Sequence, residues 1–168
     1  MIEKYINRTE FDSYEDLKNN YRVTVPADFN FAYDIVDAWA KEDPYKPALL
    51  YCNDNGERRL YTFCDMALMS NRAANYFLSL GIGKGDRVLL MLKQRVEAWV
   101  CILALCKIGA VCIPATFQLT EKDIVYRCNA AEVKAVITVA DKNITDSVIA
   151  SLPKCKTVLH YAVVGDKI

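Results

Sequence analysis

The sequence contains a single histidine, His160, among its 168 residues. Protein zinc sites need clustered histidine and cysteine ligands, and the cysteines form no CxxC pair. The seven cysteines are Cys52, Cys64, Cys101, Cys106, Cys112, Cys128 and Cys155. Because most of them stand inside apolar runs, we interpret them as buried, reduced thiols of a cytoplasmic protein and expect no metal site.

An excess of charge of either sign is also absent, since 21 basic residues balance 21 acidic ones. This balance argues against a nucleic-acid partner or an anionic membrane surface. The longest apolar run, residues 98–106, falls far short of the roughly 20 residues that a membrane span needs. The N-terminus has no apolar signal-peptide core. We therefore expect a cytoplasmic protein with no membrane span.

The sequence shows no catalytic constellation at recognisable spacing. No base partners a serine or cysteine, the acidic residues are scattered, and we interpret His160 as a satisfied strand residue. Residue chemistry by itself therefore gives little support to nucleophilic catalysis and leaves the role of the chain open.

The stretch 71–115 carries the clearest structural pattern. Apolar residues recur at three- and four-residue steps up to Leu80, Thr62 with Asp65 forms a capping box, and Gly81 is suited to a C-cap. A buried strand over 88–92, a helix over 95–108 that is apolar nearly all round, and a strand over 110–113 then predict a parallel βαβ unit. We expect this helix to be buried on every side.

The flanking segments extend this pattern to an α/β fold with a mostly parallel sheet, flanking helices and an N-terminal β-hairpin. Two strands around Asp54-Asn55-Gly56 predict the hairpin. Helices are predicted near 13–21, 31–42, 120–128 and 144–152, and strands at 135–139 and 157–164. We interpret residues 1–30 as an extension packed on a domain formed by residues 31–168.

Two loops are candidates for ligand binding. The turn from Gly81 to Asp86 resembles a phosphate loop, but it follows a helix and opens a strand, which is the reverse of the required order. We interpret it as a structural turn fixed by Asp86 and Arg87. The segment from Pro114 to Gln118 lies past the carboxyl end of a predicted strand, where open α/β sheets bind ligands.

Within that second segment, Gln118 offers an amide that both donates and accepts hydrogen bonds, and Phe117 offers an apolar face. Thr116 is their neighbour. These three residues are our candidate ligand-binding site, and an ordinary loop leading to a helix cap at Thr120 is the alternative.

Four segments, taken in order, resemble the N-terminal region of AMP-forming acyl-CoA synthetases of the adenylate-forming superfamily. They are LYTFCDM (60–66), NRAANYFLSLGIGKGDRV (71–88), CKIGAVCIPAT (106–116) and LTEKDIVYRCNAAEVKAVIT (119–138). The portion PATFQLTEKDIVYR is most similar to the medium-chain branch. The resemblance covers about residues 31–168 and implies that these form part of the large domain of the adenylate-forming fold.

The resemblance implies a ligase that converts a carboxylic (fatty) acid and ATP to an acyl-adenylate, with Mg²⁺ on the phosphates, and then transfers the acyl group to coenzyme A. It places the residue matching Gln118 on the coenzyme A and acyl side of the pocket. The phosphate loop, the adenine-binding motifs and the mobile C-terminal domain of the family have no counterpart in the chain. We therefore expect this chain by itself to be inactive and to bind none of these cofactors tightly.

The remainder of a synthetase chain is the partner that this resemblance implies. The sequence stops at 165–168, directly after an apolar strand, and parallel strands usually feed further crossovers. We expect the front part of a longer architecture. The alternatives are a stand-alone interaction or regulatory module, with a homo-oligomer on its open sheet edge as one form, and a small nucleotide-binding α/β protein.

Overall fold

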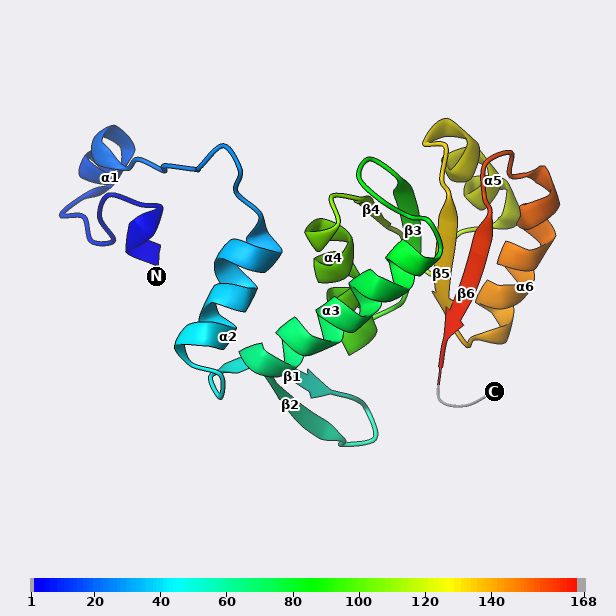
Figure 1. The fold of residues 1–168 in the computed structure, drawn as a ribbon, viewed down its shortest axis with the longest axis horizontal. Coiled ribbons are helices and arrows are strands. Elements are labelled where there is room, and N and C mark those ends of the chain that lie inside the picture. The colour runs from blue at the N-terminus through cyan, green and yellow to red at the C-terminus, as the bar shows by residue number, and fades with distance from the viewer. Residues whose placement is uncertain (1, 166–168) are drawn as a thin grey trace.

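The computed structural model describes residues 2–165 and confirms the α/β architecture. A four-stranded parallel sheet has the strand order β4-β3-β5-β6, and a separate antiparallel hairpin joins β1 to β2. Helices α3 and α4 lie on one side of the sheet, and α5 and α6 lie on the other (Figure 1). The strands are β1 (Pro47–Cys52), β2 (Arg58–Thr62), β3 (Arg87–Met91), β4 (Val111–Pro114), β5 (Ala135–Val139) and β6 (His160–Val164).

The helices follow the predicted pattern closely. Thr62 and Thr120 each form the predicted capping box, with Asp65 and Asp123 respectively. The α-helices are α1 (Tyr14–Asn20), α2 (Ala38–Glu42), α3 (Phe63–Ser79), α4 (Val96–Lys107), α5 (Glu121–Ala130) and α6 (Lys142–Ser151), and η3 (Leu152–Lys154) is a 3-10 turn. His160 pairs with Ala135 in the β5–β6 ladder, as expected of a strand residue.

The end of α3 shows why a glycine stands at position 81. The N–H of Ile82 donates to the carbonyl oxygen of Phe77 at 3.0 Å, and the N–H of Gly81 donates to that of Leu78 at 2.9 Å. These two bonds form a Schellman motif, which requires the positive φ of 71° found at Gly81. Phe77 and Ile82 are both buried, so the cap also directs the chain back into the core.

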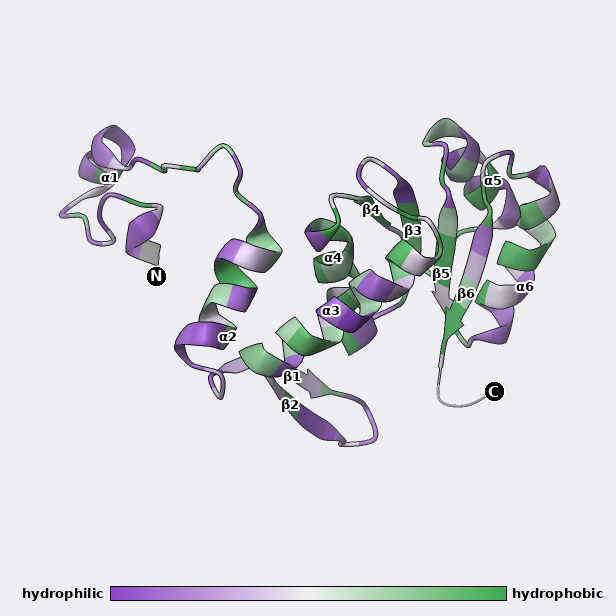
Figure 2. Ribbon diagram, in the orientation of Figure 1, coloured by the Kyte–Doolittle hydropathy of each residue, from purple (hydrophilic) through white to green (hydrophobic). Residues whose placement is uncertain are grey.

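Two apolar cores meet at α4. The main core surrounds β3 and β5 and receives Cys101, Ala104 and Leu105 from α4. The second core lies between α4, α3, β2 and the helical segment 32–37, and it receives Val96, Val100 and Leu103 from α4. Figure 2 shows the corresponding apolar colouring of β5 and α4 against the polar α1 and β2. The single helix α4 therefore joins both halves of the molecule.

The expectation that α4 is buried on every side was wrong for one edge. Trp99 is 55% exposed and lines an apolar hollow of about 300 Å³ together with Phe31, Ile35 and Phe63. A helix that supplies two separate cores has a third face between them. The amino-acid composition of α4 could not distinguish this exposed face from the two buried faces, because all three are apolar.

The predicted helix over 31–42 begins in an unexpected form. Residues Ala32–Asp37 form a π-helix (η2), which continues directly into α2. The Nζ atom of Lys107, at the end of α4, lies 2.7 Å from the Oδ1 atoms of both Asp37 and Asn71, and only 1% of the Lys107 side chain is exposed. This buried ion pair ties η2 to α3 and α4.

The predicted extension over residues 1–30 contacts the rest of the chain at one end. It contains η1 (Ile2–Lys4) and α1, and α1 has no buried residue and stands apart from the sheet (Figure 1). Tyr5 packs edge-on against Phe29, and its hydroxyl donates to the carbonyl oxygen of Asp34 at 3.4 Å. The predicted packing is therefore found near Tyr5 but not along α1. Residues 166–168 of the predicted chain end lie outside the described residues.

We predict that Lys107→Met destabilises the chain by about 3–5 kcal/mol, because it leaves the Asp37 carboxylate without its cation in a largely buried position. Urea unfolding of the purified chain measures the change. The double variant Asp37→Leu/Lys107→Met should recover part of the loss, since it removes both charges. The single variant Asp37→Leu completes the comparison. If the double variant loses as much stability as Lys107→Met and Asp37→Leu lose together, the two side chains are not coupled.

Candidate ligand site at the carboxyl edge of the sheet

The carboxyl ends of β3, β4 and β5 meet at one edge of the sheet. Strand β3 is paired with β4 on one side and with β5 on the other. The chain leaves β3 toward α4 and leaves β5 toward α6, on opposite faces (Figure 1). Open α/β sheets bind ligands at such a topological switch point. The residues that follow these strands are Lys93, Gln94, the loop from Ala115 to Gln118, and Asp141.

Lys93, which follows β3, and Asp141, which follows β5, form an ion pair across this switch point. The Nζ atom of Lys93 lies 2.7 Å from Oδ2 of Asp141. Asp141 also caps α6, because its Oδ1 accepts from the N–H of Asn143 at 3.0 Å and of Ile144 at 3.4 Å. The hydrogen bond from Lys93, followed by those from the α6 backbone, lowers the pKa of Asp141.

Lys93 has a left-handed backbone conformation, with φ at 54°. Such a conformation is uncommon for a residue with a long side chain and costs free energy that the surroundings must offset. Here the ammonium group gains the Asp141 carboxylate and also lies 5.2 Å from the centre of the Phe117 ring. Lys93 thus connects the loops that follow β3, β4 and β5.

The predicted residues lie at this edge, although not all in one cavity. Thr116 and Phe117 line a hollow of about 250 Å³ with Lys93, Gln94 and several apolar residues. Gln118 is exposed beside this hollow and is not part of its wall; its backbone N–H donates to Oγ1 of Thr116 at 3.3 Å. The remaining lining residues are Leu90, Leu92, Ala98, Ile102, Pro114 and Ala115.

Sequence reasoning missed Lys93 and Asp141. The signal that could have found them is their position, since Lys93 directly follows the predicted strand 88–92 and Asp141 stands two residues after the predicted strand 135–139. Parallel strands bring such positions to one edge, whatever the separation in sequence. The strand order is needed to see that these two are neighbours.

The turn from Gly81 to Asp86 is built as a structural turn. The Gly83 N–H donates to Oδ2 of Asp86 at 2.8 Å, and the N–H groups of Gly85 and Asp86 donate to backbone carbonyl oxygens. Asp86 pairs with Lys134 at 2.8 Å, and these contacts, with Lys134 first, lower the pKa of Asp86. A turn whose N–H groups are occupied and which carries a carboxylate does not suit a phosphate.

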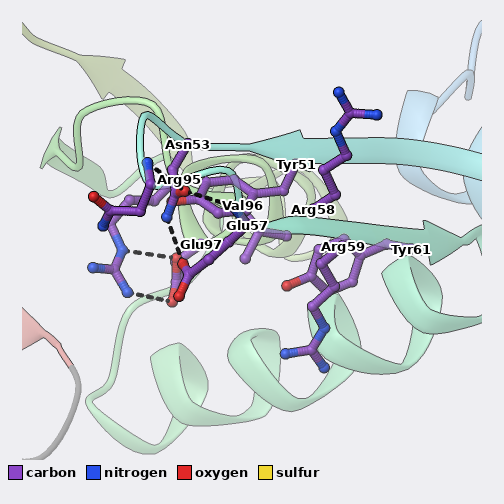
Figure 3. A pocket seen from close by; sticks show the side chains of 10 residues that line it. Tyr51, Asn53, Glu57, Arg58, Arg59, Tyr61, Arg95, Val96 and Glu97 are labelled. Carbon is purple, nitrogen blue, oxygen red and sulfur yellow. Dashed lines mark hydrogen bonds and ion pairs between the residues drawn. The ribbon is translucent and has the colours of Figure 1, made fainter.

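A hollow of about 640 Å³ lies between the hairpin and the start of α4 (Figure 3). Both of its carboxylates accept hydrogen bonds within the hollow: Arg95 donates to Glu97 at 3.1 Å, and Asn53 donates to Glu57. Arg58 and Arg59 point away from each other (Figure 3). The side chains of this hollow therefore do not converge on one point where a substrate could react.

Among residues 2–165, no three histidine, cysteine or carboxylate side chains lie close enough together to hold a metal ion. Over the same range, no helix is long and apolar enough to cross a membrane.

Comparison with known proteins decides the family. The family model described as AMP-binding enzyme matches residues 36–167. The chain belongs to this family. The match covers the sheet, its helices and the carboxyl-edge loops, so the site described above lies within the part of the chain that matches the AMP-binding family.

Curated relatives of this AMP-binding chain are acyl-coenzyme A synthetases. The mitochondrial acyl-coenzyme A synthetase ACSM3 of Pongo abelii is 33% identical over 95% of this chain, which corresponds to 29% of the relative. The mitochondrial ACSM5 of Rattus norvegicus is 39% identical over 68% of this chain and 21% of the relative. The chain therefore spans less than a third of the length of these relatives.

Solved structures agree with this assignment. A fatty acyl CoA synthetase of Mycobacterium tuberculosis superposes with a TM-score of 0.71 at 26% identity, over 80% of this chain and 26% of that protein. A putative long-chain-fatty-acid CoA ligase of Rhodopseudomonas palustris gives a TM-score of 0.72 at 26% identity, over 84% of this chain and 34% of that protein. The AMP-binding chain thus has the fold of the N-terminal region of these enzymes.

We predict that Lys93→Met raises the pKa of Asp141 toward its ordinary value of about 3.9 without reaching it, because the α6 cap remains. A lowered folded-state pKa stabilises the fold above the unfolded pKa, and this contribution is lost as the pH falls through the folded pKa. The stability difference between wild type and variant should therefore disappear in acid. Carboxyl-carbon NMR titration measures both Asp141 and, as an internal control, Asp86, whose pKa should not move.

Proposed function

We propose that this chain is the N-terminal portion of an ATP-dependent, AMP-forming acyl-CoA synthetase that activates a carboxylic acid and transfers it to coenzyme A. The observation that carries the proposal is the family match over residues 36–167 together with the synthetase relatives. Residues 1–30 form an N-terminal extension, and residues 31–168 form the N-terminal part of the AMP-binding domain. Fatty acids are the substrate class, and the partner of this portion is the remainder of the synthetase chain.

We assign Gln118, Thr116 and Phe117 to the coenzyme A and acyl side of the complete pocket. The support is their place at the carboxyl edge, where an apolar hollow lined by Thr116 and Phe117 adjoins the exposed Gln118. Such a surface suits a pantetheine arm, which carries amide groups on an apolar chain. The Gln118 amide could then satisfy one of those groups, while Phe117 covers the chain.

The chain by itself is proposed to be inactive. Stabilisation of a transferring phosphoryl group requires donors and cations preorganised around it. In this chain, however, Lys93 and Lys134 are already paired with carboxylates. ATP, Mg²⁺ and coenzyme A belong to the longer protein. A cytoplasmic location remains a prediction, and the relatives named above carry the word mitochondrial in their names.

The alternative of a stand-alone interaction module is supported by one surface feature. Leu50 and Leu60 face each other across the hairpin and are both exposed, as a partner surface would require. The intact mass of the protein from its native cells separates the two proposals. A polypeptide far heavier than 19.0 kDa supports the synthetase portion, whereas one near 19.0 kDa supports the module.

We predict that the purified 168-residue chain shows no ATP-dependent exchange of pyrophosphate with any fatty acid tested, because the phosphate-binding groups are missing. Cooperative thermal unfolding of the same sample serves as the control for a folded protein. Exchange above the rate of a heat-denatured sample would contradict the proposed inactivity.

We predict that Gln118→Ala in the complete synthetase raises KM for coenzyme A about three- to tenfold, as expected for the loss of one hydrogen bond to the ligand. KM for ATP should change less, since the phosphates bind elsewhere. Lys122→Ala, an exposed change nearby on α5, is the matched control. An increase confined to KM for ATP would remove Gln118 from the coenzyme A side.

A further inference from the structure

Two cysteines far apart in the sequence lie side by side behind the sheet. Cys128 stands on α5 and is fully buried, and Cys155 follows η3 and is half-buried. Both belong to the main core cluster, and the Cys155 thiol is close enough to Cys128 to help raise the pKa of Cys128. The two thiols are therefore candidates to react with each other.

The backbone around Cys155 is held in place against α5. The Nδ2 atom of Asn129 donates to the carbonyl oxygen of Lys154 at 3.0 Å, and the N–H of Lys156 donates to Oδ1 of Asn129 at 2.8 Å. Asn129 follows Cys128 directly, so its side chain fixes the residues on both sides of Cys155 next to Cys128. Lys154 adds an ion pair with Glu121, at 2.6 Å.

The two thiols differ in reactivity. Burial, and then the adjacent Cys155, raise the pKa of Cys128 to about 12, so this thiol remains protonated at neutral pH. Only the thiolate attacks a disulfide, and access to the sulfur also limits the rate. The half-buried Cys155 is therefore the thiol that meets an external reagent first, and Cys128 can act only on a neighbour already in contact with it.

We propose that Cys128 and Cys155 are a reversible redox pair, which closes to a disulfide when the protein meets a small-molecule disulfide such as oxidised glutathione. The Cys155 thiolate attacks oxidised glutathione, forms a mixed disulfide and releases one glutathione. The Cys128 sulfur then attacks the Cys155 sulfur as its proton passes to the departing glutathione thiolate, so that the second glutathione leaves as the thiol. The pair is oxidised by two electrons, and one oxidised glutathione becomes two reduced molecules.

The other cysteines provide internal comparisons. Cys101 and Cys112 are close enough to influence each other electrostatically, but no side-chain hydrogen bonds fix their neighbourhood in the way that Asn129 does for Cys155. Cys52 is exposed on the hairpin, and the Cys106 thiol donates to Oδ1 of Asn30 at 3.3 Å. The proposal thus singles out one pair among the seven cysteines and does not depend on the proposed synthetase function.

The test is a redox titration of the purified chain with reduced and oxidised glutathione, followed by alkylation, intact mass and peptide mapping. We expect one intramolecular disulfide, mapped to Cys128 and Cys155, which dithiothreitol reverses. The oxidised form should have a Tm higher by several degrees, because the link closes a loop in the unfolded chain. Cys101→Ser is the matched control and should leave closure unchanged.

Two variants separate the two chemical steps. Cys155→Ser should abolish closure and leave Cys128 unmodified, whereas Cys128→Ser should trap the glutathione adduct on Cys155. Because Cys128 is in the core, Cys128→Ser can fail to fold. In that case the Cys155→Ser result and the peptide map of the wild type test whether the disulfide joins Cys128 to Cys155. A stable glutathione adduct on wild-type Cys155 without closure, or a bond between Cys101 and Cys112 instead, would overturn the proposal.

Discussion

The burial of α4 between two cores is the constraint on which the rest of the structure depends. Leu105 on one side completes the packing around β3 and β5, and Leu103 on another side completes the packing against η2 and α3. Complete burial of one such leucine contributes about 1.5–3 kcal/mol. The crossover between β3 and β4 is thus more than a connection, because it fixes the hairpin half of the molecule against the sheet half.

This constraint also positions the carboxyl edge. With α4 held on one face, the chain must leave β3 toward that face, whereas α5 and α6 occupy the other face. The divergence leaves Lys93 and Asp141 opposite each other at the point where the connections separate. The left-handed backbone of Lys93 is a local cost that the ion pair and the Phe117 contact offset. The edge is therefore preorganised by contacts between loops that come from three strands.

Features fixed by nearby residues were predictable from the sequence. The capping boxes at Thr62 and Thr120, the hairpin turn at Gly56 and the extent of β5 depend on neighbours a few residues apart. The π-helix at 32–37 and the exposure of Trp99 were not predictable, because they occur beside tertiary features that local sequence does not show, namely the ion pair between Lys107 and Asp37 and a second apolar core. For the same reason the sequence located the 114–118 loop but not its partners Lys93 and Asp141.

Charge pairing explains how the loops at both ends of the sheet are held in place. At the amino end of the sheet, Lys134 neutralises Asp86, and Arg87 pairs with Glu132; at the carboxyl end, Lys93 neutralises Asp141. These pairs hold loops in place, and a cation already used in this way stabilises a developing phosphate charge far less than a preorganised free one. We therefore propose that cations and N–H donors for adenylation come from other segments of the synthetase, and that this portion contributes the apolar hollow and the fixed edge against which they assemble.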